Sequence, residues 1–233
     1  GPEALHAVCG DLGGVTSPKK PRLSLNHTEV GPTLHLTPRN KSNMPADIQT
    51  TFTTAFQEAQ LSFGKHKKAA AMLYKLKSTS DAQAFQDEFF ACVSCVLTVY
   101  KREPAAERIV EFIVAFATQS AEGEAYDEAF MQSLCMRLLK LAGAKDKAVR
   151  FRVAQLVGRM LNSMADDAEE AEVSDELFEA VEEAMIVRCN DKDPLVRAWA
   201  LKALYRLQNP LEASDTITHE LLRLMADDAK KEV

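Results

Sequence analysis

From residue 44 onward, apolar residues recur at intervals of three and four, which is the period of an amphipathic α-helix. One stripe contains Ile109, Phe112, Ile113 and Phe116. A second contains Val149, Val153, Leu156, Val157, Met160 and Leu161, and a third contains Val196, Ala200, Ala203, Leu204 and Leu207. No segment shows the sustained apolar–polar alternation with β-branched residues that is typical of strands. The pattern therefore predicts an all-α protein.

Local start signals divide these stripes into short helices. Pro104 and Pro194 suit a first helical residue, because that position needs no N–H. Ser80 and Gln83 have the spacing of a capping box, and Ser174 precedes two acidic residues that suit a helix N-terminus. We expect helices near residues 46–62, 65–78, 81–102, 104–120, 127–142, 147–164, 174–189, 194–208 and 214–226.

A short motif recurs within this helical part. Ala148-Val149-Arg150 opens one expected helix, and Leu195-Val196-Arg197 opens another 47 residues later. Helix pairs repeating at spacings of about 37–47 residues are typical of HEAT repeats, which stack into an α-solenoid of antiparallel helix pairs. Within such a stack, Asp191 lies in the tight turn between two helices, and Arg150 and Arg197 reach neighbouring turns. These three residues are the predicted polar ladder between repeats.

The domain boundaries follow from the Gly and Pro content and from the repeated motif. Residues 1–43 hold five of the nine Gly and five of the nine Pro and no aromatic residue, so we expect a disordered tail or an upstream extension, with Met44 as the native start. Residues 44–233 are the expected HEAT repeats. Asp228 and Val233 match Asp191 and Val196 at an offset of 37, which predicts that the chain stops inside a repeat of a longer solenoid.

Charge is unevenly distributed along the chain. The formal net charge is -6, from 28 Lys+Arg and 34 Asp+Glu, which excludes a uniformly basic nucleic-acid binder. Residues 165–183 hold ten of the acids and no base. Residues 64–78 hold five lysines and no acid, namely Lys65, Lys67, Lys68, Lys75 and Lys77. These lysines are either a DNA-contacting face or an ordinary solvated surface.

A second basic strip is expected on the second helices of the repeats. Those helices tend to line the concave side of a HEAT array, where Arg152, Arg159, Lys202 and Arg206 could follow a row of phosphates. Such contacts touch only the nucleic-acid backbone, so they position a protein on DNA without reading its sequence. Arg150 and Arg197 are interpreted as ladder residues rather than phosphate ligands.

Three longer stretches carry a family signal, namely residues 99–112 (VYKREPAAERIVEF), 148–157 (AVRFRVAQLV) and 188–197 (RCNDKDPLVR). Two shorter ones are residues 203–208 (ALYRLQ) and 55–60 (AFQEAQ). Together they resemble the condensin complex subunit 3 (CAP-G) family, in colinear order from about 50 to 208. The resemblance implies a HEAT-repeat subunit that holds double-stranded DNA jointly with a kleisin subunit during mitotic chromosome condensation. It also implies a location in the nucleus and on chromosomes, with the cytoplasm possible in interphase. The ATPase of such a complex lies in its SMC subunits.

Other kinds of function find little support in the sequence. Cys92 and Cys95 form a CxxC, but they lie in an apolar helical stripe and have no neighbouring His, which favours core thiols over a metal or redox site. Trp199, Tyr205 and Phe151 are interpreted as packing residues. We expect no enzyme activity, cofactor, metal, membrane partner or small-molecule substrate. The main alternative is a HEAT scaffold that binds only protein, and a less favoured one is a thiol-dependent enzyme built on the CxxC.

Overall fold

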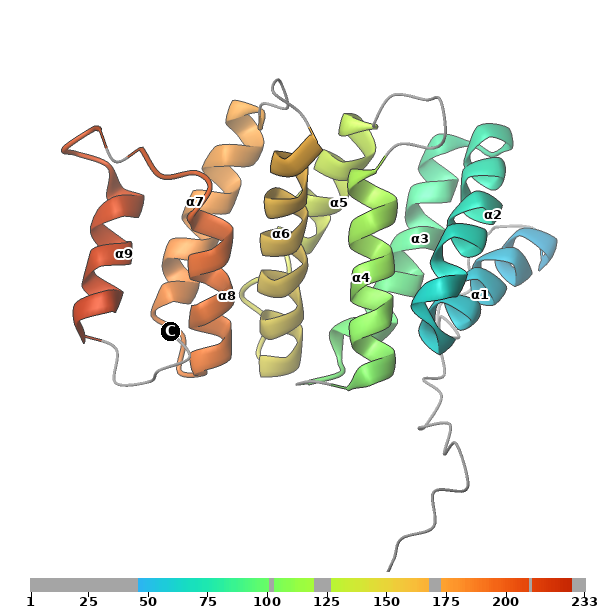
Figure 1. Cartoon of the computed structure of the whole chain (residues 1–233), viewed down its shortest axis with the longest axis horizontal. Helices are drawn as coiled ribbons and strands as arrows, with labels where there is room; N and C mark the ends of the chain where they lie inside the picture. Colours follow the sequence, from blue (N-terminus) through green and yellow to red (C-terminus); the bar gives the residue numbers. More distant parts are fainter. Residues whose placement is uncertain (1–45, 101–102, 120–126, 168–172, 210, 228–233) are drawn as a thin grey trace, which may run out of the picture. The chain divides into compact units, whose positions relative to one another are not determined.

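The computed structural model describes residues 46–100, 103–119, 127–167, 173–209 and 211–227. These residues form α-helices and one short 3-10 helix, with no strand among them, so the all-α prediction is confirmed (Figure 1). The helices are α1 (Ala46–Leu61), η1 (Phe63–Lys65), α2 (His66–Thr79), α3 (Ala82–Leu97), α4 (Pro104–Thr118), α5 (Glu128–Leu139), α6 (Lys147–Asp167), α7 (Asp175–Cys189), α8 (Pro194–Leu204) and α9 (Thr216–Asp227).

Short polar side chains begin several of these helices. Asp127, Ser174 and Asp193 each accept a hydrogen bond from a backbone N–H of the following turn, which satisfies a donor that has no partner inside the helix. Pro104 and Pro194 lie in the first turn of α4 and α8, as predicted.

Three local predictions need correction. Asp81, not Ser80, caps α3, because its carboxylate accepts from Ala84 N at 2.9 Å. The Ser80 hydroxyl instead donates to the Leu76 carbonyl at the end of α2, at 2.7 Å. The two helices predicted over 81–102 and 194–208 end earlier, at Leu97 and Leu204. The predictions for residues 1–43 and for the repeat at 228–233 lie outside the described residues.

The helices pack as successive pairs in two layers. α1 contacts α2, α3 contacts α4, α5 contacts α6, and α7 contacts α8. Helix α6 also packs against both α4 and α8, while α5 contacts α3 and α7, and α7 contacts α9. The layer of α4, α6 and α8 therefore lies beside the layer of α3, α5, α7 and α9 (Figure 1). This is the arrangement of a HEAT solenoid, in which each pair buries the apolar face of its neighbour.

The core runs between the two layers. The stripe that contains Ile109, Phe112, Ile113 and Phe116 is buried as predicted, and Phe116 packs against Phe89 with ring centroids 5.1 Å apart. Full burial of one such side chain contributes roughly 1.5–3 kcal/mol. None of the described helices combines the length and the apolar character that a membrane crossing requires.

Candidate functional site

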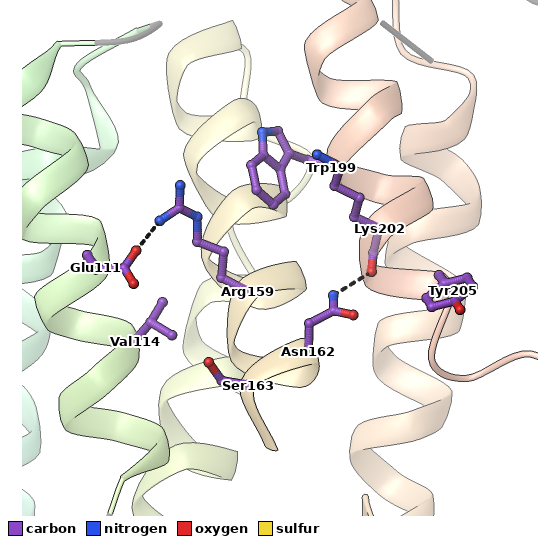
Figure 2. Close-up of a pocket in the computed structure, with 8 residues that line it drawn as sticks. All are labelled: Glu111, Val114, Arg159, Asn162, Ser163, Trp199, Lys202 and Tyr205. Carbon is purple, nitrogen blue, oxygen red and sulfur yellow. Dashed lines mark hydrogen bonds and ion pairs between the residues drawn. The ribbon is translucent and has the colours of Figure 1, made fainter. Parts of the chain in front are cut away.

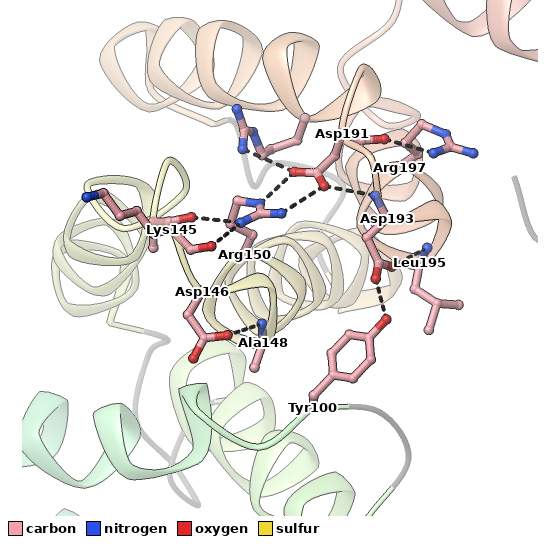
Figure 3. Close-up of polar contacts among 11 residues, drawn as sticks. Tyr100, Lys145, Asp146, Ala148, Arg150, Asp191, Asp193, Leu195 and Arg197 are labelled. Atoms are coloured by element: carbon pink, nitrogen blue, oxygen red, sulfur yellow. Dashed lines mark hydrogen bonds and ion pairs between the residues drawn. The ribbon is translucent and has the colours of Figure 1, made fainter.

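The predicted ladder residues meet where four chain segments come together (Figure 3). Arg150 of α6 donates from Nε to Asp191 Oδ2 at 2.7 Å and from Nη2 to Oδ1 at 3.1 Å. Its Nη1 donates to the carbonyls of Ala144 and Lys145, both at 2.9 Å. Arg197 Nη1 donates to the Asp191 carbonyl at 2.8 Å. Arg150 and Asp191 together thus link the turns that follow α5 and α7 to the first turns of α6 and α8, through the Asp191 carboxylate on Arg150 and the Asp191 carbonyl on Arg197.

The charge of Asp191 is held in place by its partners. Burial disfavours the carboxylate, but hydrogen bonds from Arg150 and from the Asp193 N–H, together with the Arg150 and Arg188 charges, hold the pKa of Asp191 below its usual value. Asp193 accepts a hydrogen bond from the Tyr100 hydroxyl. Burial and that bond raise the pKa of Tyr100 to about 12. The connection before α4 is therefore tied to the start of α8.

The lysines of α2 and η1 fall into two groups. Lys65 pairs with Glu58 at 2.7 Å, and Lys77 pairs with Asp127 at 2.5 Å while its ammonium lies 4.5 Å from the centroid of Phe130. Lys67, Lys68 and Lys75 are exposed. Helix α2 itself has no acidic residue, and Glu58 of α1 feels the charge of Lys68 as well as that of Lys65. The exposed ammonium groups give α2 an accessible positive face.

Arg152 was predicted to contact phosphate, and that prediction is wrong. Its side chain has no exposed surface, because α6 turns it toward the α3–α4 connection. Nε donates to the Val99 carbonyl at 2.7 Å, and Nη1 donates to Glu107 and to Gln155, both at 2.6 Å. Arg152 is therefore an internal tie between neighbouring helix pairs.

Arg159 lies in a cleft of about 580 Å³ formed by α4, α6 and α8 (Figure 2). The guanidinium donates to Glu111 at 2.5 Å and to Glu107 at 3.2 Å. Two carboxylates therefore compensate its charge, and about half of the Glu111 side chain is exposed. A phosphate approaching Arg159 meets that carboxylate as well, which disfavours the predicted phosphate contact.

Trp199 forms the α8 side of this cleft. The indole lies between two cations, with the Lys202 Nζ 4.4 Å and the Arg159 guanidinium carbon 5.5 Å from the ring. Asn162 donates to the carbonyls of Gly158 and Lys202, at 2.6 and 2.8 Å, and joins α6 to α8 at the cleft floor. Lys202 forms no ion pair with any described residue.

The aromatic residues and Arg206 complete the description of this surface. Phe151 is buried, as its interpretation as a packing residue requires. Tyr205 is 57% exposed and lines the cleft, so it is not a core residue. Arg206 is also exposed, directly after Tyr205. The cleft thus joins an indole, a phenol and an ammonium that has no ion pair with a described residue, which is a composition that favours recognition rather than catalysis.

The described cysteines are unsuited to thiolate chemistry. Cys92, Cys135 and Cys189 are buried and Cys95 is half-buried. Burial raises the pKa of Cys135 and of Cys189 to about 12, and it raises that of Cys92 and Cys95 as well. Among the described residues, no group of His, Cys, Asp and Glu has the geometry to hold a metal ion. The thiol-enzyme alternative therefore loses its support.

The chain is similar to a family of repeats and to several known proteins. Residues 183–209, which span the end of α7, the Asp191 turn and α8, match the HEAT repeat family. The chain is 34% identical over 192 residues to condensin complex subunit 3 of Homo sapiens, an alignment that covers 80% of this chain and 18% of the human protein. Condensin complex subunit 3 of Xenopus laevis is 34% identical over 187 residues, covering 77% of this chain and 18% of that protein.

A fission yeast relative extends the comparison to a solved structure. Condensin complex subunit 3 of Schizosaccharomyces pombe is 27% identical over 176 residues, covering 75% of this chain and 19% of that protein. The crystal structure of the S. pombe condensin Cnd3–Cnd2 subcomplex matches with a TM-score of 0.63 and 26% identity, over 80% of this chain and 22% of that chain. The chain spans about a fifth of the length of the curated relatives it matches.

The stacked pairs, the Arg150–Asp191 ladder and the repeat match define the chain as a HEAT-repeat protein. Across about 80% of its length it is similar to condensin complex subunit 3. The family resemblance found in the sequence is thereby confirmed.

Proposed function

We propose that the chain is the N-terminal HEAT-repeat part of a non-catalytic condensin subunit, which acts in chromosome condensation in the nucleus and on chromosomes. It contributes two binding surfaces, one for double-stranded DNA and one for a kleisin subunit that links it to the SMC ATPases. The proposal is supported by the identity to condensin complex subunit 3 proteins and by the likeness to a subunit solved together with Cnd2.

The DNA surface is assigned to the exposed lysines of α2. Lys67, Lys68 and Lys75 project from a helix that has no acid, in a chain with a net charge of -6. Lysine side chains displace condensed counterions from duplex DNA without reading its sequence, so affinity falls as salt rises. Arg206 is a secondary contact, whereas Lys65 and Lys77 each give part of their charge to an acid of the protein.

The experiment is a salt titration of duplex affinity, measured by fluorescence anisotropy with the whole chain. We expect a linear plot of log affinity against log salt, with a slope of about −0.9 for each phosphate contacted. The combined substitution Lys67→Glu, Lys68→Glu and Lys75→Glu should make that slope less steep, by the amount that corresponds to roughly two phosphate contacts or more.

Three other exposed lysines provide a matched control. Lys140, Lys145 and Lys192 are exposed and lie outside α2, and their replacement by Glu changes the net charge by the same amount. The control variant should keep the wild-type slope. Equal slopes for wild type and the α2 variant would remove α2 from the site. No salt-dependent affinity at all, even with the kleisin subunit supplied, would overturn the DNA function in favour of a protein scaffold.

The cleft of α4, α6 and α8 is assigned to a segment of the kleisin subunit. Glu111, and Glu107, which Arg159 shares with Arg152, place carboxylates beside the Arg159 guanidinium, and these carboxylates repel a DNA backbone. Trp and Tyr are frequent anchors of protein interfaces, and Lys202, which has no ion pair with a described residue, offers its ammonium to a carboxylate. The expected ligand segment therefore presents an apolar or aromatic side chain beside an acid.

Isothermal titration calorimetry with the kleisin subunit tests this assignment. Trp199→Ala should weaken binding about tenfold or more, and Lys202→Glu should also weaken it without removing apolar contacts. Phe63, which is 61% exposed on η1, provides the control: Phe63→Ala should leave the affinity unchanged. Wild-type affinity in both cleft variants would place the kleisin elsewhere on the chain.

A further inference from the structure

A second cleft, of about 370 Å³, lies in the other helical layer between α5 and α7. Its apolar lining consists of Met136, Leu139, Ala142, Ala180, Ala184 and Val187. It shares no residue with the cleft of Arg159 and Trp199. We call it the α5–α7 groove, and neither proposed surface makes use of it.

Small side chains create the hollow. Ala180 and Ala184 are one turn apart on α7, and Gly143, in the turn after α5, has open space where a Cβ would lie. Val187 follows on α7 and is 54% exposed, although most apolar side chains of this helix are buried or half-buried. Covering this surface with an apolar ligand would be favourable, because apolar area removed from water contributes about 25 cal/mol per Å².

The charged side chains along the α5–α7 groove differ between its two ends. Lys140, at the C-terminal cap of α5, is exposed and forms no ion pair with any described residue. Arg188, in the last turn of α7, also lines this end, but its guanidinium pairs with Asp191 at 3.1 Å, so Lys140 supplies the positive charge. Glu183 lies further up α7, toward its N-terminus, and is exposed. The groove is therefore positive at the end where α5 and α7 have their C-termini. It is negative more than a turn away, at Glu183.

Both helices reach this positive end with their C-termini. Arg150 bonds to the carbonyls of Ala144 and Lys145 after α5 and to the carboxylate of Asp191 after α7, so the two turns lie together (Figure 3). The last carbonyls of a helix carry partial negative charge, which favours the positive N-terminus of a third helix beside them. The ligand that fits is thus a helix running antiparallel to α5 and α7.

We propose that the α5–α7 groove binds an amphipathic helix of a partner protein, which lays its apolar face on Ala184 and Val187 and places an acidic first turn against Lys140. This is the helix-in-groove mode of recognition. A second copy of this chain is a poor fit, because α9, which exposes Leu222 and Met225, has no acid in its first turn. The site is independent of the DNA and kleisin surfaces.

Two stapled, fluorescein-labelled helical peptides with the same apolar face serve as probes, with anisotropy of the whole chain as the readout. One carries acids in its first turn and lysines in its last turn, and the other has the reverse order. We expect the acid-first peptide to bind about tenfold more tightly than the reversed one. Lys140→Glu should remove or invert that preference, and Val187→Glu should weaken both peptides about tenfold or more.

Matched substitutions decide between occupants and test for misfolding. Leu222 is 58% exposed on α9, so Leu222→Glu is the same kind of change on another surface and should not affect either peptide. Circular dichroism melting should show that all variants remain folded. Absence of binding by the acid-first peptide, or equal affinity for both peptides, overturns the proposal. Self-association that both Val187→Glu and Leu222→Glu abolish also overturns it, by assigning the groove to a second copy.

Discussion

Arg150 and Asp191, 41 residues apart in the sequence, form a two-point ion pair at the junction of two helix pairs, with N–O distances of 2.7 and 3.1 Å. The Asp191 side chain is almost fully buried, and only 15% of the Arg150 side chain is exposed. Arg188 adds a second cation at 3.1 Å, and the Asp193 N–H donates to the same carboxylate at 3.0 Å. Loss of this one carboxylate leaves two guanidinium groups and a backbone N–H without their acceptor.

Asp191→Ala should therefore destabilise the protein by roughly 3 kcal/mol, the range for removing one member of a buried ion pair. Urea titration followed by far-UV circular dichroism measures the loss. Because stability in stacked repeats is local, hydrogen exchange should rise most in α7 and α8. The double substitution Arg150→Ala and Asp191→Ala should cost less than the sum of the single ones. Additive losses would show that the pair is not coupled.

The stability provided by Asp191 should disappear in acid. Its pKa is lowered in the folded protein, so its contribution is present above the unfolded value of about 3.9 and is lost as the pH falls through the folded value. The difference in melting temperature between wild type and Asp191→Asn should be largest near neutral pH and should shrink below about pH 4. Glu183→Gln, which removes an exposed carboxylate, controls for the loss of one charge and should change the melting temperature little.

Most of the fold was predictable because its signals are local. Pro104, Ser174 and Pro194 start their helices where the sequence indicates, since N-terminal preferences depend on a few neighbouring residues. The helix that the sequence predicts to end near residue 102 ends at Leu97 in the structure. The chain leaves the helix there to bring Tyr100 to Asp193, and a contact across 93 residues has no local signature.

The candidate site was only partly predictable for the same reason. Arg150, Arg152 and Arg159 belong to one basic helix, and their spacing does not distinguish a ladder residue from a phosphate ligand. The difference comes from distant partners: Val99 and Glu107, which lie 53 and 45 residues from Arg152, enclose its side chain. Glu107 and Glu111 likewise compensate Arg159 from another helix. The lysines of α2 were easier to find because the helix itself has no acid.

Arg152→Met should separate stability from DNA binding. The substitution removes the donors to the Val99 carbonyl, Glu107 and Gln155. We expect the free energy of unfolding, measured by urea titration, to fall by about 2–4 kcal/mol. The loss is limited because Glu107 keeps its ion pair with Arg159. Arg152→Lys should recover only part of this loss, because an ammonium cannot reproduce the planar fork. The salt dependence of duplex affinity should match wild type, and a slope flattened as far as in the α2 lysine variant would restore Arg152 to the DNA surface.

Gly158 sets the distance between α6 and α8, because a Cβ there would lie 3.3 Å from both the Trp199 carbonyl oxygen and the Ala203 nitrogen. Both are backbone atoms, so α8 itself must move to make room. Gly158→Ala should be close to neutral, since about 1 kcal/mol of helix propensity offsets the crowding. Gly158→Val should cost roughly 1–3 kcal/mol and weaken kleisin binding at the adjacent cleft of Trp199.

Gly143→Ala is the matched control for this substitution. A Cβ at Gly143 meets nothing within 4 Å, so the change should be neutral or stabilise by about 0.4–1 kcal/mol through the unfolded chain. Urea titrations of the three variants, with calorimetry of the kleisin complex, provide the measurements. If Gly158→Val proves as stable as Gly143→Ala, the close approach of α6 and α8 is not a constraint on the cleft, and the spacing of the two helices must be set by other contacts, such as the Asn162 bridge to the Lys202 carbonyl.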